Sequence, residues 1–208
     1  MLDFVRTTVW PRIPTLRIAS VNRIGLNRLL LQQFARLDAG CVLDVGAKGS
    51  PYTQIIPSTR YLRLDIDPTS EPDICCDIHH LDWKAHSFDT VVAVEVLEHL
   101  YDPQLALDRV WHVLKPGGIC IASTRFLYRY HPDPQDYYRF TWDSLEHLFR
   151  KFEHVEVHHH GNRLQSIWEM INAGGRSRVL LNVFNPLVAR FESKQTRFPL
   201  GFVIYARK

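Results

Sequence analysis

Short apolar runs alternate with amphipathic stretches along this chain, and the alternation predicts its strands and helices. Apolar residues recur at helical spacing over 26–37 and 103–114, and Thr141 can cap a third helix. We expect the first two helices to stop at Gly40 and at the Lys-Pro-Gly-Gly run over 115–118. Seven short apolar runs indicate strands, at 41–45, 61–66, 74–78, 91–96, 119–122, 155–158 and 201–206.

This order of elements is typical of an α/β domain with a mostly parallel sheet and helices on both faces. We expect one domain over 1–208, with a helical extension over 1–40 and a helical insertion over 160–197 between the last two strands. In such sheets, ligands bind beyond the carboxyl ends of the strands. The residues directly after each strand are therefore the candidates for chemistry.

Composition and charge narrow the class of protein. Of the 208 residues, 46% are hydrophobic and 23% charged, and no apolar stretch is long enough for a transmembrane span or a signal peptide. The four cysteines form no C-x-x-C pair. We expect a cytoplasmic protein. Basic segments over 1–40 and 160–208 flank an acidic centre. This distribution of charge favours either an anionic partner or an ordinary solvated surface. No nucleic-acid partner is expected.

Polar groups stand at four of the predicted strand ends. A glycine turn over 46–49 follows the first strand, and such turns let backbone amides approach a ligand closely. Asp65 and Asp77 follow the second and third strands, and Asp65 stands where a carboxylate can accept the hydroxyls of a ribose. The fourth strand is followed by Glu95-Val-Leu-Glu-His99. Each group alone is common in loops, but together they predict a ligand site.

In order and spacing over 41–123, and more loosely over 124–158, these motifs resemble class I S-adenosylmethionine-dependent methyltransferases of the type 11-like group. The resemblance rests on Leu43-Asp-Val-Gly46, Asp65, Asp77, Ser87-Phe-Asp-Thr-Val-Val92, Glu95-Val-Leu-Glu-His99 and Leu114-Lys-Pro-Gly-Gly118. It implies S-adenosylmethionine as the cofactor. It also implies a Rossmann-like, doubly wound sheet of seven strands, mostly parallel, with an antiparallel last strand.

The same resemblance implies where the cofactor lies. Its methionine part would contact the ends of the first and fourth strands, namely Gly46, Ala47, Lys48, Gly49, Glu95 and Val96. Asp44 would hold the turn and, indirectly, the cofactor's ammonium group. Asp65 would accept the ribose hydroxyls and Asp77 the adenine amino group, with the adenine between Ile66 and Ile78.

One part of the glycine turn departs from the family pattern. Lys48 and Ser50 stand where the family usually has glycine, and we expect neighbouring Gly49 to adopt the positive φ that the turn needs. Lys48 either reaches the cofactor carboxylate or points outward. The departure keeps open a non-catalytic module with a degenerate turn. An NAD(P)-dependent oxidoreductase is less favoured, because residues 46–51 lack the G-x-G-x-x-G pattern.

The segment over 125–140 is rich in aromatic and hydrogen-bonding side chains and follows the fifth strand, next to the expected methyl group. It is either an acceptor-binding loop or a rigid, self-packed one. We expect three of its residues to shape the acceptor pocket, namely Tyr128, Tyr137 and Arg139. The acceptor would be a small molecule, a glycan or a lipid-linked compound methylated at oxygen. A general base for such a reaction is most often histidine, and the candidates are His99 and His131.

The insertion carries apolar residues at helical spacing and several arginines. It can pack on the domain as a lid, meet a second subunit, or contact an anionic membrane through 176–194. The lid is favoured. No metal site is expected at the histidine run over 158–160, because neighbours in a strand point to opposite faces and no acidic partner is evident.

Overall fold

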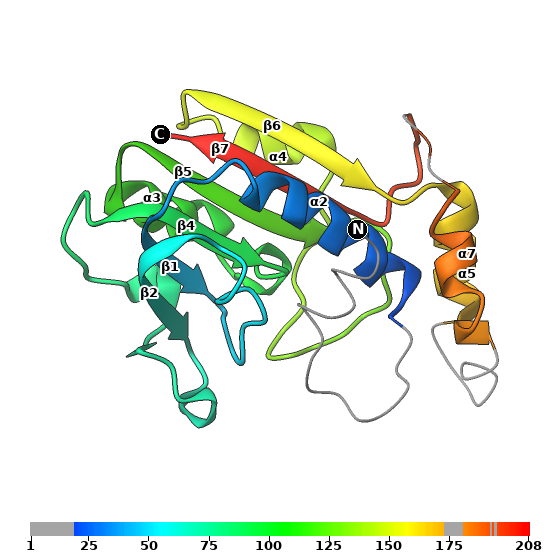
Figure 1. Ribbon diagram of the computed structural model, residues 1–208, viewed down its shortest axis with the longest axis horizontal. Helices are drawn as coiled ribbons and strands as arrows, with labels where there is room; N and C mark the ends of the chain where they lie inside the picture. The colour runs from blue at the N-terminus through cyan, green and yellow to red at the C-terminus, as the bar shows by residue number, and fades with distance from the viewer. Residues whose placement is uncertain (1–18, 173–180, 192, 194) are drawn as a thin grey trace.

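One seven-stranded sheet runs through the centre of the fold (Figure 1). The computed structural model describes residues 19–172, 181–191, 193 and 195–208. The strand order is β3-β2-β1-β4-β5-β7-β6, and β7 alone runs antiparallel to its neighbours. The Rossmann-like sheet with an antiparallel last strand is confirmed. The strands are β1 Gly40–Val45, β2 Ser58–Asp65, β3 Ile74–Cys75, β4 Phe88–Val94, β5 Leu114–Arg125, β6 His154–His160 and β7 Gly201–Arg207.

Helices cover both faces of this sheet. Successive residues of a strand point to opposite faces, so Val42 of β1 packs with α2, whereas Leu43 and Val45 pack into the larger core under α3 and α4. Short 3-10 helices follow β2, β3 and β4. The helices of this part are α2 Val21–Phe34, α3 Pro103–Val113 and α4 Trp142–Leu148, and the 3-10 helices are η1 Pro68–Ser70, η2 Ile78–His80 and η3 Leu97–His99.

The helix α2 begins earlier than its apolar spacing predicts. The side chain of Ser20 accepts a hydrogen bond from the backbone N–H of Arg23 at 3.1 Å and so caps the helix six residues before Leu26. The expected stop at Gly40 is wrong, since Gly40 is the first residue of β1. A Cβ atom there would come within 2.7 Å of Asp89, so the strand needs glycine for a close approach.

Two further boundaries differ from the pattern. β3 ends at Cys75 because the side chain of Asp77 accepts from the backbone N–H of His79 and begins η2 at Ile78. β5 extends from Leu114 through the Lys-Pro-Gly-Gly run, in which Gly117 adopts a φ of +76°. The cap at Thr141 is confirmed, with Ser144 completing a capping box.

In the described part of the segment between β6 and β7, the helices α5 Arg163–Asn172 and α7 Asn185–Val188 lie together at one end of the molecule (Figure 1). Trp168 Nε1 donates to Asn185 Oδ1 at 2.8 Å and joins them. Of the segment 176–194, for which a membrane contact is one expectation, residues 176–180 lie outside the described residues. The expected packing on the domain is present only in part: Val188 and Trp168 pack with Val21 of α2, whereas the other described residues of the two apolar stripes are exposed, namely Leu164, Ile167, Ile171, Val183, Phe184, Leu187 and Phe191.

Within the described residues, none of the helices has the length and apolar character needed to cross a membrane.

Candidate active site at the carboxyl ends of the strands

The glycine turn lies against the residue that follows β4. Gly46 has a φ of +66°, and a Cβ atom on it would come within 2.7 Å of Val96 Cγ2. Both the backbone conformation and the space therefore require glycine at this position. The ends of β1 and β4 meet here, as adjacent parallel strands do. The structure thus brings Gly46, Ala47 and Val96 to one edge of the sheet.

Lys48, and not Gly49, provides the second left-handed residue of the turn. Its φ is +39°, while Gly49 lies outside the positive-φ region, so the expectation for Gly49 is wrong. The backbone N–H of Lys48 donates to Asp65 Oδ2 at 2.8 Å, which holds this conformation. Its side chain points outward to the loop over 125–140, where Nζ lies 3.1 Å from a carboxylate oxygen of Asp133. Of the two alternatives for Lys48, the structure shows the outward one.

Asp44 lies beneath the turn in a hydrogen-bonded network that the sequence did not indicate. Its Oδ2 accepts from the hydroxyl of Tyr61 at 2.6 Å, and that hydroxyl lies 3.4 Å from Ser50 Oγ. Burial raises the pKa of Asp44 to about 6, although the hydrogen bonds from Ser50 and Tyr61 lower it. Ser50 therefore has a structural use at a position where glycine is usual.

Asp65 connects two turns through its carboxylate. Oδ2 accepts from Lys48 and Oδ1 accepts from the backbone N–H of Asp67 at 2.9 Å, and the residue is buried. Each carboxylate oxygen retains a second lone pair. The neighbouring Ile66 side chain is 56% exposed and offers an apolar surface beside Asp65.

The end of β3 is more closely packed than the resemblance implies. Ile78 is buried in the core, so Ile66 is the open apolar surface and the Ile78 side chain has a packing role. Oδ1 of Asp77 accepts from the backbone and ring nitrogens of His79, at 2.9 and 2.5 Å. His79 is buried and stacks on Tyr101 at 3.9 Å, a contact that no sequence motif indicated.

Beyond β4, an ion-pair cluster is buried that the sequence also did not reveal. Arg125, at the end of β5, pairs with Glu95 and lies with its Nε 3.8 Å from Glu98 Oε1. Glu98 is fully buried, and burial, together with the charge of Glu95, raises its pKa to about 8. Thr124 Oγ1 donates to the other oxygen of Glu98 at 2.9 Å. The spacing of the two glutamates in Glu95-Val-Leu-Glu-His99 was the available signal.

The loop over 125–140 folds back onto η3. The backbone N–H of Tyr137 donates to the Glu98 carbonyl at 2.8 Å. Arg139 donates from both terminal nitrogens to Asp136, at 2.5 and 2.6 Å, and holds the pKa of that carboxyl well below its usual range. Because both terminal nitrogens of its guanidinium already donate to Asp136, Arg139 positions the loop and does not offer this pair of donors to an acceptor.

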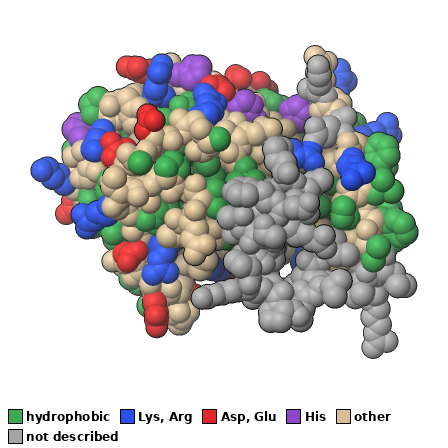
Figure 2. All heavy atoms as spheres, viewed as in Figure 1, with side chains coloured by type: hydrophobic (Ala, Val, Ile, Leu, Met, Phe, Trp, Pro, Cys, Tyr) green, Lys and Arg blue, Asp and Glu red, His purple; other side chains and the backbone are tan. Residues whose placement is uncertain are grey.

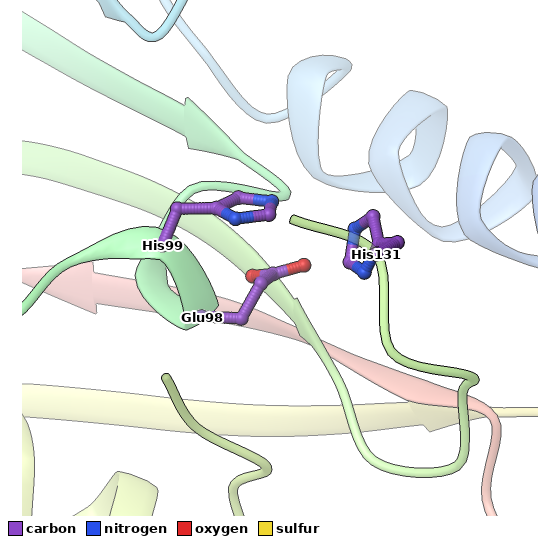
Figure 3. Close-up of side chains that lie close together, drawn as sticks. All are labelled: Glu98, His99 and His131. Carbon is purple, nitrogen blue, oxygen red and sulfur yellow. The ribbon is translucent and has the colours of Figure 1, made fainter. Parts of the chain in front are cut away.

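The two histidines predicted as candidate bases lie together. Their rings are 4.9 Å apart, and Tyr128 lies 5.0 Å from His131 on another side. Figure 3 shows His99 and Glu98 on η3 facing His131 on the loop. Burial and the charges of Arg125 and His99 lower the pKa of His131, which favours its neutral form. Tyr137 is exposed at the same loop.

The histidine run at the end of β6 differs from its expected surroundings. An acidic partner is present, because Glu156 lies 3.0 Å from His158 Nε2 and 2.9 Å from His154 Nε2. Arg36, which follows the C-terminal end of α2, pairs with the same carboxylate at 2.7 Å. His160 lies on the same face of β6 as His158, as alternation along a strand requires, and is buried against α2.

Comparison with known proteins places these strand ends in a family context. Residues 37–122 match the family model described as a methyltransferase domain. A ubiquinone biosynthesis O-methyltransferase of Nitrobacter winogradskyi is 33% identical over 97 residues, which are 46% of this chain and 34% of that protein. The chain thus spans about a third of the length of the curated relatives it matches first.

Two solved structures show the same fold. One is a possible histamine N-methyltransferase of Thermotoga maritima, with a TM-score of 0.60 and 17% identity, covering 90% of this chain and 91% of that chain. The other is a Haemonchus contortus phosphoethanolamine N-methyltransferase in complex with S-adenosyl-L-methionine, with a TM-score of 0.59 and 16% identity, covering 88% of this chain and 52% of that chain.

Proposed function

The chain belongs to the class I S-adenosylmethionine-dependent methyltransferases, and from this premise we propose that it transfers the methyl group of S-adenosylmethionine to an oxygen of a small-molecule or lipid-linked acceptor. The observation that carries the proposal is the turn at Gly46, where the absence of a side chain leaves space beside Val96. This turn belongs to the segment that matches a methyltransferase domain. The name of the relative, a ubiquinone biosynthesis O-methyltransferase, supports oxygen as the methylated atom.

The residues present fit the cofactor. The Gly46 turn offers close backbone approach for its methionine part, Asp65 keeps lone pairs for ribose hydroxyls, and Ile66 offers an apolar surface to the adenine. When bound, S-adenosylmethionine supplies a methyl group on a good leaving group. The protein's own contribution is then mainly to align the acceptor. We propose that one of the two neighbouring histidines, His99 or His131, takes the proton of an acceptor hydroxyl.

The structure gives little support to the alternative of a non-catalytic module with a degenerate turn. Lys48 directs its side chain away from the turn to Asp133, and Ser50 joins the hydrogen bonds around Tyr61. Lys48 and Ser50, which replace the usual glycines, therefore leave the space beside Gly46 open. An NAD(P) site is disfavoured by the missing G-x-G-x-x-G pattern.

Exchange of single glycines tests the proposed function. Gly46→Ala should weaken S-adenosylmethionine binding at least tenfold, about 1.4 kcal/mol, because the new methyl group meets Val96 in a left-handed backbone. Gly117→Ala is the matched control and should bind like wild type, since Gly117 also has a positive φ but lies outside the site, with nothing within 4 Å of its Cβ position. Calorimetry with S-adenosylmethionine measures both, and labelled methyl transfer into a cell-lipid extract measures activity. If wild type binds NAD but no S-adenosylmethionine, the proposal is wrong.

We also propose that the exposed apolar stripes of α5 and α7 contact an anionic lipid surface, from which a lipid-linked acceptor is taken. These stripes are bordered by exposed basic side chains, and Figure 2 shows apolar side chains gathered at this end of the molecule beside basic ones. An apolar face with a basic border suits an anionic bilayer surface. Among the described residues, the exposed basic side chains near the stripes are Arg163, Arg190 and Arg197.

Vesicle sedimentation tests this surface. The protein should pellet with anionic phosphatidylglycerol vesicles, and Phe184→Ser with Leu187→Ser should reduce the bound fraction at least tenfold, because both side chains are about half exposed on the apolar face. The matched control is Tyr130→Ser, an exposed aromatic side chain on the loop over 125–140. High salt should release the wild type. If the same fraction of the protein pellets with neutral and with anionic vesicles, the proposed contact with an anionic lipid surface is wrong.

A further inference from the structure

Three potential metal ligands converge at the acceptor end of the site. Ligand atoms of Glu98, His99 and His131 all lie within 4.8 Å of one another, and among the described residues this is the one group of three or more acidic, histidine or cysteine side chains placed in this way. Glu98 and His99 come from η3, and His131 comes from the facing loop (Figure 3). Folding of the loop onto η3 therefore assembles the group from two distant segments.

Both imidazoles are oriented as metal ligands are. His99 Nδ1 donates to the carbonyl oxygen of Gln135, and His131 Nδ1 lies 3.3 Å from Asp136 Oδ2. Asp136 is itself held by both terminal nitrogens of Arg139. A metal-binding histidine usually gives its second N–H to a carbonyl or carboxylate in this way, which fixes the ring and leaves the other nitrogen for the metal. In both rings, that other nitrogen is Nε2.

Glu98 adds an independent sign of a missing ligand. Its side chain is fully buried, and Oε2 accepts from Thr124. Oε1 has no hydrogen-bond donor among the described residues, although Arg125 Nε lies 3.8 Å away. A buried carboxylate oxygen without a donor is costly, and a cation held between it and the two imidazoles would satisfy it.

The local charge also allows a cation. Three carboxylates, those of Glu95, Glu98 and Asp136, stand against the two guanidiniums of Arg125 and Arg139. Once Glu98 is ionised, as a bound cation would favour, one negative charge is left over while both histidines are neutral. Arg125 is nearer to Glu95, with which it is paired, so it leaves Glu98 Oε1 without a direct hydrogen bond.

We propose that Glu98 Oε1 and the Nε2 atoms of His99 and His131 bind one divalent transition-metal cation. Two imidazoles with one carboxylate suit zinc, iron, cobalt or manganese better than magnesium or calcium, which prefer oxygen ligands. With bonds of about 2.0–2.2 Å, the three ligands draw together by roughly 1 Å around the ion. Three protein ligands leave positions open for an acceptor oxygen, and this last role rests on the proposed function, whereas cation binding does not.

Cobalt titration of metal-free protein tests the site, because Co²⁺ bound to nitrogen and oxygen ligands absorbs visible light. Wild type should bind one Co²⁺ per chain. His131→Ala and Glu98→Gln should each weaken binding at least tenfold. The first change is on a partly exposed loop, and in the second the new amide oxygen can still accept from Thr124. Thermal unfolding confirms that both variants are folded.

The matched control is His154→Ala, which removes a histidine beside Glu156 on β6 and should leave Co²⁺ binding unchanged. The site is refuted if wild type shows no saturable Co²⁺ binding, or if His131→Ala and Glu98→Gln bind Co²⁺ as wild type does. S-adenosylmethionine calorimetry on the same samples separates the two proposals. Cobalt bound without S-adenosylmethionine binding refutes the proposed function and leaves the metal site standing.

Discussion

Replacing Arg125 with methionine should lower the free energy of unfolding by about 3 kcal/mol. The guanidinium is almost fully buried and faces two carboxylates, Glu95 and Glu98, of which the second has no exposed surface. Removing it leaves both carboxylates without their cation. The value lies at the low end for a broken buried ion pair because burial and the charge of Glu95 raise the pKa of Glu98, so Glu98 need not carry a charge at neutral pH. Urea unfolding at neutral pH measures the loss.

A surface ion pair provides the comparison. Lys151→Ala removes an exposed pair with Asp108 and a contact with the Trp111 ring, and should cost no more than about 1 kcal/mol. Adding Glu95→Gln to the Arg125→Met protein should recover part of the loss, because it removes the Glu95 charge that had been paired with Arg125. If Arg125→Met is no less stable than Lys151→Ala, the buried cluster does not stabilise the fold.

The positions of the central strands were readable from the sequence because each is a short apolar run buried on both faces. Cys41 to Val45 and Val91 to Val94 show this clearly, and they pair directly in the sheet. Thr141 was recognisable as a cap because a hydroxyl before an amphipathic run satisfies free backbone amides by itself. Such features depend on neighbours in the chain, so a local pattern is enough to predict them.

The details of the site depend on contacts between distant segments. Lys48 takes the positive φ that was expected of Gly49 because Asp65, seventeen residues away, accepts its N–H. Glu98 meets Arg125 only when β4 and β5 pair, and His131 meets His99 only when the loop folds onto η3. Residue types and spacing placed the histidines on candidate segments, but could not show that they touch.

The apolar stripes of α5 and α7 show a different limit. Their spacing correctly indicates helical faces, yet it is the same for a face that packs on the domain and for one that faces outward. Trp168 joins the two helices to each other through Asn185, and the residues Ile167 and Leu187 remain exposed. Which of the two faces is covered is a property of the tertiary fold.

The pH dependence of stability should change strongly on replacing Asp44 with asparagine. Relative to Asp44→Asn, wild type should lose about 3 kcal/mol of unfolding free energy between about pH 4 and pH 7. The pKa of Asp44 rises from 3.8 to about 6 on folding, with burial as the main cause. The folded protein therefore holds a proton that the unfolded chain has released, and this contribution is complete below about pH 4 and lost as the pH rises through about 6.

Asparagine is a suitable replacement because its side-chain oxygen can still accept from the Tyr61 hydroxyl, while it carries no charge to bury. Comparing urea unfolding of the two proteins at each pH cancels the titration of all groups that they share. Asp67→Asn is the control, because that carboxylate is exposed and its pKa is lowered by hydrogen bonds from Thr69, so the sign of its smaller effect is opposite. A constant difference between wild type and Asp44→Asn across this range would mean that Asp44 ionises in the folded protein as readily as in the unfolded chain, and that the network of Tyr61 and Ser50 compensates fully for its burial.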